Sequence, residues 1–394
     1  MTESMQKFAD ARQQAEELVE TEERVEAEER VEAEERVETL DAAEGGQGGA
    51  NRRDADSGTW RASIRRPISA LSRPGPWKRG LVLAALALLL GLVMLLHARI
   101  TDRWGLGSLV ETFLPWFGVF VPVLLAGALW RRSTSAVVAL LLPVVVWLSL
   151  FGGLLGDKSH PDSDLTLVTH NVGAENPDPA GTARALAASG ADVLALVEIT
   201  SQAKPLYEKA LAKAYPYHTA QGTVGLWSKL PLSDTRPVDT ELDAGPLGRA
   251  KPYDLKMSYN RALRTTVATD QGPLAVYVAH LGSVRLMPRG GYWTDSRDRS
   301  AQALAEAIAA ERNERVVLLG DLNGTMDDRA LDGITTQLHS VQEKAGDGFG
   351  FSWPAKFPVV RIDQILVRGV EPKKSWLLPA TGSDHLPVAA GISW

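Results

Sequence analysis

Hydrophobic and polar positions follow different patterns in four successive stretches of this chain. Residues 1–50 are rich in Glu, and their valines at positions 25, 31 and 37 recur with a hexapeptide, EERVEA. A period of six matches neither 3.5 nor 3.6, so these valines do not share one face of a helix. The pattern predicts a disordered acidic tail, and we assign no chemistry to it.

Three long apolar runs follow within residues 81–156. The first begins at Leu81, the second covers roughly Leu109–Trp130, and the third covers roughly Ser135–Leu155. A run of about 18 residues is just long enough to cross the hydrocarbon core of a bilayer. Three nearly uncharged runs in succession favour three transmembrane helices over buried core helices. A cleavable signal peptide is disfavoured because the first run starts so far into the chain.

Residues 160–394 combine short apolar runs with amphipathic stretches. We expect strands at 165–172, 192–200, 223–228, 262–269, 274–280, 315–320, 362–368 and 387–393, and helices at 178–190, 204–214 and about 296–311. Strands outnumber helices, and several strands follow one another directly. The pattern predicts an α/β domain with two packed sheets and helices outside them, rather than one doubly wound parallel sheet.

Composition and charge restrict the possible chemistry and predict how the chain is oriented in the membrane. The chain has 394 residues, a net charge of -6 and no cysteine, which excludes disulfides, thiolate catalysis and Cys-ligated zinc. Residues 51–80 are basic and immediately precede the first apolar run, so a juxtamembrane segment explains them more simply than a nucleic-acid patch. By the positive-inside rule this segment is cytoplasmic, and residues after about 157 lie outside.

Polar side chains stand where the expected strands end. They are Asn171, Glu198, His280, Asp321, Asn323, Asp363, Asp384 and His385. Asp321 and Asn323 are two residues apart, so in a continuous strand they would point to the same face. Each residue alone has an ordinary explanation as a turn, cap, ion pair or buried histidine. Six such endings in one domain favour a shared functional site.

The ordered motifs THNV, VLALVEI, AHLGS, GDLNG, RIDQIL and GSDHLPV resemble the endonuclease/exonuclease/phosphatase superfamily, which has the DNase I-like fold. The segment FSWP at 351–354 also resembles this family, and the resemblance covers nearly all of 165–394. It implies a four-layer α/β/β/α sandwich with its site at the top of both sheets. The implied reaction is phosphoester hydrolysis with a divalent metal.

The resemblance also implies which residues bind the metal and which act on water. Glu198 and Asn171 would offer hard oxygen ligands to Mg²⁺ or Mn²⁺. Asp384 would be a further metal ligand or an acid that contacts the ligands. His385 would be the base that activates water, with Asp363 holding its other ring nitrogen.

Four further residues would contact the substrate. Asp321 and Asn323 would position the nucleophile and the scissile phosphate, and His280 would bond a phosphoryl oxygen. Arg264 takes the phosphate-binding place, although Arg261 is close by. The family commonly has Ser-Arg where this chain has Ser-Lys at 228–229, and Lys makes no bidentate phosphate contact. Segments 233–262 and 283–295 are expected to select the substrate.

The arrangement of an N-terminal tail, three spans and an external domain resembles the VanJ-type membrane proteins of bacteria. Those proteins are associated with glycopeptide-antibiotic resistance. This resemblance implies a lipid-linked phosphate or pyrophosphate of the cell envelope as substrate and the lipid bilayer as partner. Nucleic acid is less favoured because the charge of the domain is nearly balanced. An extracellular nuclease and a non-catalytic sensing or binding module remain as alternatives.

Overall fold

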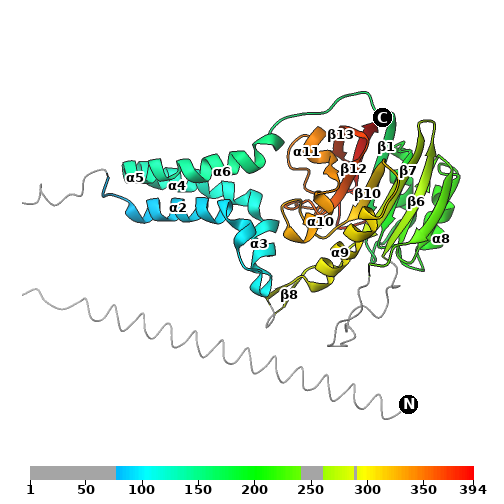
Figure 1. Cartoon of the computed structure of the whole chain (residues 1–394), viewed down its shortest axis with the longest axis horizontal. Helices are drawn as coiled ribbons and strands as arrows, with labels where there is room; N and C mark the ends of the chain where they lie inside the picture. The colour runs from blue at the N-terminus through cyan, green and yellow to red at the C-terminus, as the bar shows by residue number, and fades with distance from the viewer. Residues whose placement is uncertain (1–76, 241–260, 288–290) are drawn as a thin grey trace, which may run out of the picture. The chain divides into compact units, whose positions relative to one another are not determined.

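The computed structural model describes residues 77–240, 261–287 and 291–394 (Figure 1). The predictions for the acidic tail, for most of the basic segment and for most of 233–262 lie outside the described residues. Residues 81–154 contain a series of helices, and residues 165–394 form two β-sheets with helices.

The apolar part contains several helices of unequal length. They are α2 (Leu81–Leu95), α3 (Leu106–Thr112), α4 (Phe120–Trp130), α5 (Thr134–Ala139) and α6 (Leu141–Phe151), with 3-10 turns η2 (His97–Arg99), η3 (Arg103–Gly105), η4 (Leu114–Val119) and η5 (Gly152–Leu154). The helical stretch Thr134–Leu154, with 21 residues, is long and apolar enough to cross a membrane. A second span exists if Arg103–Thr112 and Leu114–Trp130, bent by 66°, count as one.

The second apolar run is therefore not one straight helix from Leu109 to Trp130. It breaks at Phe113, two residues before Pro115, whose ring removes a backbone donor and disfavours helical geometry in the preceding residue. The first run gives only the 15 residues of α2. Among the described residues, one or two helices thus have spanning length, where the sequence predicted three.

Two mixed six-stranded sheets form the rest of the molecule. The first has the order β13-β14-β1-β2-β4-β3, with bounds Glu371–Leu377, Val388–Ser393, Leu165–Asn171, Val193–Val197, Val224–Ser228 and Tyr217–Gln221. The second has the order β11-β12-β10-β7-β6-β5, with bounds His339–Ser340, Asp363–Arg368, Val316–Asp321, Gly272–His280, Ala262–Thr269 and Leu232–Pro237. A small hairpin joins β8 (Arg285–Met287) to β9 (Gly291–Trp293).

Three apolar layers hold the sheets and helices together. The largest layer lies between the two sheets and includes Leu167, Val276 and Ile365. On the outer face of the second sheet, α9 (Asp295–Ala309) and α10 (Asp332–Thr335) lie beside β10 (Figure 1). Helices α7 (Pro179–Ala188) and α8 (Lys204–Leu211) cover the first sheet. The short elements η6 (Arg329–Leu331) and α11 (Val341–Ala345) complete the domain. This arrangement confirms the predicted α/β fold with two packed sheets.

The strands that the sequence missed have exposed or polar positions. Strands β3 and β5 are at the sheet edges, and β5 is exposed along most of its length. An edge strand needs no continuous apolar run, so its sequence carries little strand signal.

Strand direction brings the polar residues to one edge. Strand β1 is parallel to β2, so Asn171 pairs with Val197, next to Glu198. Strand β10 is parallel to β7 and antiparallel to β12, so Asp321 lies between His280 and Asp363. Five strands of two sheets therefore end or begin at the same edge.

Candidate active site

Asp321 is the residue on which the site converges. Asp321 is 1% exposed. Asn171 Nδ2 donates a hydrogen bond to Asp321 Oδ2 at 2.9 Å, and the backbone N–H of Asn323 donates to Oδ1 at 2.9 Å. The Nε2 atoms of His280 and His385 lie 3.7 and 3.9 Å from Asp321 Oδ2.

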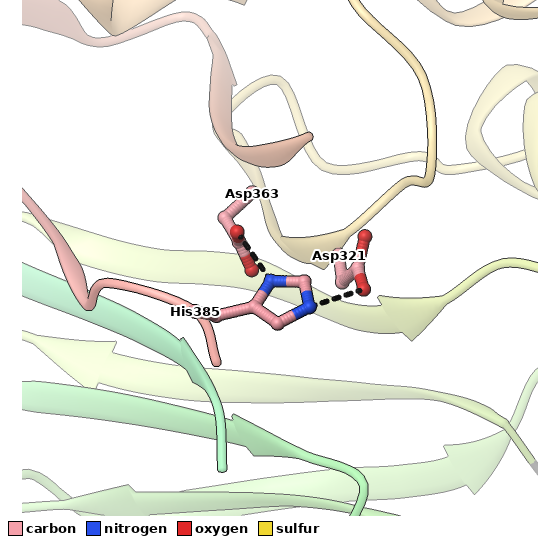
Figure 2. Close-up of side chains that lie close together, drawn as sticks. All are labelled: Asp321, Asp363 and His385. Carbon is pink, nitrogen blue, oxygen red and sulfur yellow. Dashed lines mark hydrogen bonds and ion pairs between the residues drawn. The ribbon is translucent and has the colours of Figure 1, made fainter. Parts of the chain in front are cut away.

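His385 lies between two carboxylates, as Figure 2 shows. Its Nδ1 is 2.8 Å from Asp363 Oδ2, and its Nε2 faces Asp321. An ionised carboxylate only accepts hydrogen bonds, so Nδ1 carries the proton that is shared with Asp363. Ser352 Oγ donates to the same Asp363 oxygen at 2.6 Å and holds that carboxylate in place. We call Asp321, Asp363 and His385 the Asp–His–Asp cluster.

The electrostatics of this cluster favour positive charge. Burial alone would lower the pKa of His385, but the charge and hydrogen bond of Asp363 outweigh burial and raise it to about 10. Burial, followed by the charge of Asp363, raises the pKa of Asp321. Asp363 Oδ1 is buried and has no hydrogen-bond partner among the described residues. A buried, incompletely paired group of carboxylates is a place where a cation is stabilised.

Glu198 and His280 extend the cluster. Glu198 has a φ of 63°, and its Oε2 accepts a hydrogen bond from the backbone N–H of Ala174 at 3.1 Å. Its Oε1 lies 3.4 Å from His280 Nε2. Arg261 Nη2 lies within 2.8 Å of the His280 ring nitrogens. Burial and the charge of Arg261 hold the pKa of His280 well below its usual value, so this imidazole is neutral.

The donor atoms suit a hard divalent cation. Asp321, Asp363 and His385 each offer one ligand atom, and these atoms lie within 4.8 Å of one another. Glu198 places a further carboxylate beside His280, whereas Asn171 directs its amide nitrogen at Asp321. A set dominated by carboxylate oxygens matches Mg²⁺ or Mn²⁺. These residues therefore fit the divalent ion implied by the sequence motifs.

The structure brings together seven of the nine residues that the sequence singled out for the site. They are Asn171, Glu198, His280, Asp321, Asn323, Asp363 and His385. Asp384 is exposed beside His385, and its Oδ2 accepts a hydrogen bond from Trp353 Nε1 at 3.1 Å. It lies at the rim, outside the group of potential ligands formed by the Asp–His–Asp cluster.

Arg264 lies outside the site and corrects the expectation of a phosphate contact. Its guanidinium is bonded to Glu311 Oε2 at 2.8 Å and to Asp234 Oδ2 at 2.6 Å. Arg261 is the arginine at the site, because β6 is antiparallel to β7 and its first residues lie beside the end of β7. In the observed register Ala262 pairs with Ala279, which places Arg261 beside His280. Knowing this register would have led to Arg261 rather than Arg264.

Lys229, the departure from the family's Ser-Arg pattern, lies away from the cluster. Strand β4 is antiparallel to β2, so its end pairs with Val193 at the beginning of β2. Lys229 Nζ donates to Gly190 O at 2.6 Å and to Asp192 Oδ1 at 3.1 Å. The Lys that replaces the family's Arg at this position therefore makes no contact with the Asp–His–Asp cluster among the hydrogen bonds of the described residues.

Comparison with known proteins identifies the family. Residues 168–385, more than half of the chain, match the model of the Endonuclease/Exonuclease/phosphatase family. The chain belongs to this family. A comparison with curated proteins found no match.

Solved structures with a similar arrangement share little sequence with the chain. A Staphylococcus aureus beta toxin mutant with bound magnesium ions is 17% identical, covering 58% of this chain and 99% of the toxin with a TM-score of 0.44. An endonuclease/exonuclease/phosphatase from Bacteroides vulgatus is 17% identical, covering 59% and 99%, with a TM-score of 0.46. D. rerio TDP2 complexed with a single-strand DNA product is 20% identical, covering 59% and 100%, also with a TM-score of 0.46. At these values the likenesses carry no argument about function.

Proposed function

We propose that the protein is a membrane-anchored, extracytoplasmic phosphoesterase that requires Mg²⁺ or Mn²⁺. The observation that carries this proposal is the Asp–His–Asp cluster, in which His385 is oriented by Asp363 and faces a second buried carboxylate, Asp321. A non-catalytic module would have no need for a buried imidazole held between two acids beside Glu198 and Asn171.

Each side chain has a defined task in phosphoester hydrolysis. When bound, a divalent ion supplies positive charge that offsets the negative charge growing on the phosphoryl oxygens. Asp363 holds one proton of His385 on Nδ1. The carboxylate charge that raises the pKa of His385 would be offset by a bound divalent ion, so that Nε2 is unprotonated and can take a proton from the attacking water. Arg261 and neutral His280 lie side by side and donate hydrogen bonds to a phosphoryl oxygen in the transition state.

The apolar helices supply the proposed anchor. We propose three spans with the N-terminus in the cytoplasm, and α2 crosses together with the flanking residues of its apolar run. Large apolar side chains on these helices are exposed, including Val82, Val123, Leu129, Leu141 and Val145. Such a surface is stable in lipid and is unfavourable in water.

The anchor favours a substrate at the membrane surface. We propose a lipid-linked phosphate or pyrophosphate of the cell envelope, and the likeness to VanJ-type proteins links this reaction to glycopeptide resistance. The nuclease alternative keeps the same catalytic residues and differs only in the substrate.

Phosphate release by the full-length protein in detergent tests the substrate. The protein is incubated with Mg²⁺ and a polyprenyl pyrophosphate, and in parallel with nicked DNA, with His385→Ala and Glu198→Ala as controls. We expect lipid turnover that both substitutions abolish. DNA turnover alone would replace the envelope substrate by nucleic acid, and no turnover of either substrate would contradict the proposed reaction.

A further inference from the structure

The segment between the first two apolar helices contacts the loop that follows Asp321. Glu111 of α3 is fully buried, and its carboxylate accepts hydrogen bonds from Arg329 Nη2 at 2.7 Å and Nε at 2.9 Å. The Arg329 guanidinium also donates to the carbonyls of His97 at 2.9 Å and Ile100 at 2.6 Å. One arginine from the catalytic domain therefore binds three points of the segment 97–112.

A second group of buried polar residues lies between this contact and the active site. Ser108 Oγ donates to Asp328 Oδ2 at 2.8 Å, and Arg297 of α9 donates to the same oxygen at 2.6 Å. Arg297 Nη2 also donates to Ser108 Oγ at 3.0 Å. Ser108, Arg297 and Asp328 are each at most 1% exposed. We call these three residues the buried polar bridge.

The bridge reaches the catalytic loop directly. Arg297 Nη1 lies 3.3 Å from the backbone carbonyl oxygen of Asn323 and donates to it. Asn323 has a φ of 48°, a conformation that non-glycine residues adopt only when their surroundings hold them there. Its side chain donates to Leu281 O at 3.1 Å, directly after His280. Arg297 is thus one of the contacts that fix Asn323.

The backbones of the two parts also approach closely. A Cβ atom on Gly105 would lie 1.7 Å from the carbonyl oxygen of Tyr292, and one on Gly291 would lie 2.5 Å from that of Trp104. The β8–β9 hairpin, which belongs to the segment 283–295 that was expected to select the substrate, therefore packs on residues 103–112. Glycine at these two positions permits a contact that any side chain would prevent.

We infer that the segment 97–112 is a structural part of the active site, and that Ser108 and Arg297 are positioning residues that hold Asn323. This inference rests on the proposed phosphoesterase function. A connector that served only as a tether would need no buried ionic contacts, since burying an Arg–Asp pair carries a large desolvation cost and apolar side chains dock as well. What the bridge adds is a fixed geometry, because hydrogen bonds to charged groups are directional.

The test compares full-length variants in detergent by two readouts. Ser108→Ala removes the hydroxyl that joins α3 to Asp328, and Arg297→Lys keeps the charge but loses the forked donors. Ser133→Ala is the matched control, because Ser133 is a buried serine of the apolar helices. Its side chain caps α5 and makes no described hydrogen bond to residues 165–394. The readouts are amide hydrogen exchange over residues 321–331 and the kinetics of Mg²⁺-dependent phosphate release from a polyprenyl pyrophosphate.

We expect exchange over 321–331 to rise by about tenfold in both bridge variants, the factor that corresponds to losing one hydrogen bond to a charged group. We also expect kcat to fall by about 10–100-fold with KM within about twofold, because Asn323 is displaced while substrate contacts remain. Ser133→Ala should leave both readouts at wild-type values.

Unchanged exchange in the two bridge variants would overturn the inference, as would an equal loss of kcat in Ser133→Ala. If wild-type protein released no phosphate, the proposed function would fail, and hydrogen exchange alone would then decide whether the bridge holds the loop.

Discussion

Single residues determine the chemistry of the cluster through charge. His385 and Asp363 form a buried hydrogen bond of 2.8 Å, and the opposite side of the imidazole faces Asp321. The proton on Nδ1 and the orientation of Nε2 both depend on Asp363. The clearest consequences therefore come from removing the charge of Asp363 while keeping its shape.

Asp363→Asn should lower the pKa of His385 from about 10 toward its ordinary value, because the neighbouring negative charge is lost. Histidine NMR of the metal-free protein measures this change. The same variant should lower kcat by about 10²–10⁴-fold at saturating Mg²⁺. Asp270→Asn, at an exposed hairpin turn, is the control. A variant whose kcat recovers fully at high Mg²⁺ would show that Asp363 is a metal ligand rather than the partner of a base.

The sequence predicted most residues of the site because they terminate strands, but it could not predict their conformations. Asp321 and Asn323 were expected to share one face of a strand. The strand ends at Asp321, and the positive φ of Asn323 turns its side chain to Leu281 O instead. Arg264 was preferred to Arg261 because strand register, which separates them, is a tertiary property.

At the scale of elements, the site depends on how closely β10 approaches β7. Gly320 has a φ of 146°, and a Cβ atom there would lie 1.8 Å from the carbonyl oxygen of Ala279. Gly320→Ala should therefore separate the two strands just before Asp321 and His280. We expect a loss of about 2–4 kcal/mol in the free energy of unfolding.

Thermal unfolding measures this loss, with Gly153→Ala as the control because no atom lies within 4 Å of a Cβ built there. Equal melting temperatures for Gly320→Ala and wild type would contradict the close packing of β7 and β10.

The ion pair between Arg264 and Glu311 links β6 to the end of α9 and gives a pH-dependent stability. Burial alone would raise the pKa of Glu311, but hydrogen bonds from Arg264 and the backbone of Asn313 lower it to about 2. A carboxyl with a lowered pKa in the folded state stabilises the protein above its ordinary pKa, and this contribution is lost as pH falls from about 4.5 to 2.

Glu311→Gln should therefore lower the free energy of unfolding by about 2–3 kcal/mol at neutral pH. The difference from wild type should narrow as the pH falls from about 4.5 toward 3, because Glu311 is protonated in the unfolded state before it is protonated in the folded state. Chemical denaturation at both pH values measures it, and a difference independent of pH would argue against the ion pair.

For the molecule as a whole, the number and orientation of the membrane spans are the prediction to test. The sequence predicted three spans from apolar runs alone, yet only Thr134–Leu154 forms a helix of clear spanning length among the described residues. Hydropathy could not predict that residues 103–112 pack on the domain formed by residues 165–394, because the partners Arg297 and Arg329 lie about two hundred residues away in the chain. Such contacts between distant residues have no local sequence signal.

The absence of cysteine makes the topology directly measurable. Arg131 and Asp157 are both exposed and flank the third apolar run, so Arg131→Cys and Asp157→Cys report on its two sides. In intact cells, a membrane-impermeant maleimide should label Asp157→Cys and should label Arg131→Cys only after lysis. Labelling of both variants in intact cells would contradict the proposed crossing and orientation.

Metal-dependent hydrolysis by the Asp–His–Asp cluster is tested by titrating Mg²⁺ and measuring phosphate release. Wild-type protein and His385→Ala are compared over the same range of Mg²⁺, starting from protein treated with EDTA. We expect no release without metal and saturable release with Mg²⁺ in wild type. We expect the rate of His385→Ala to be at least about 10³-fold lower at every Mg²⁺ concentration. Release that persists in EDTA, or a His385→Ala variant with wild-type kcat, would contradict it.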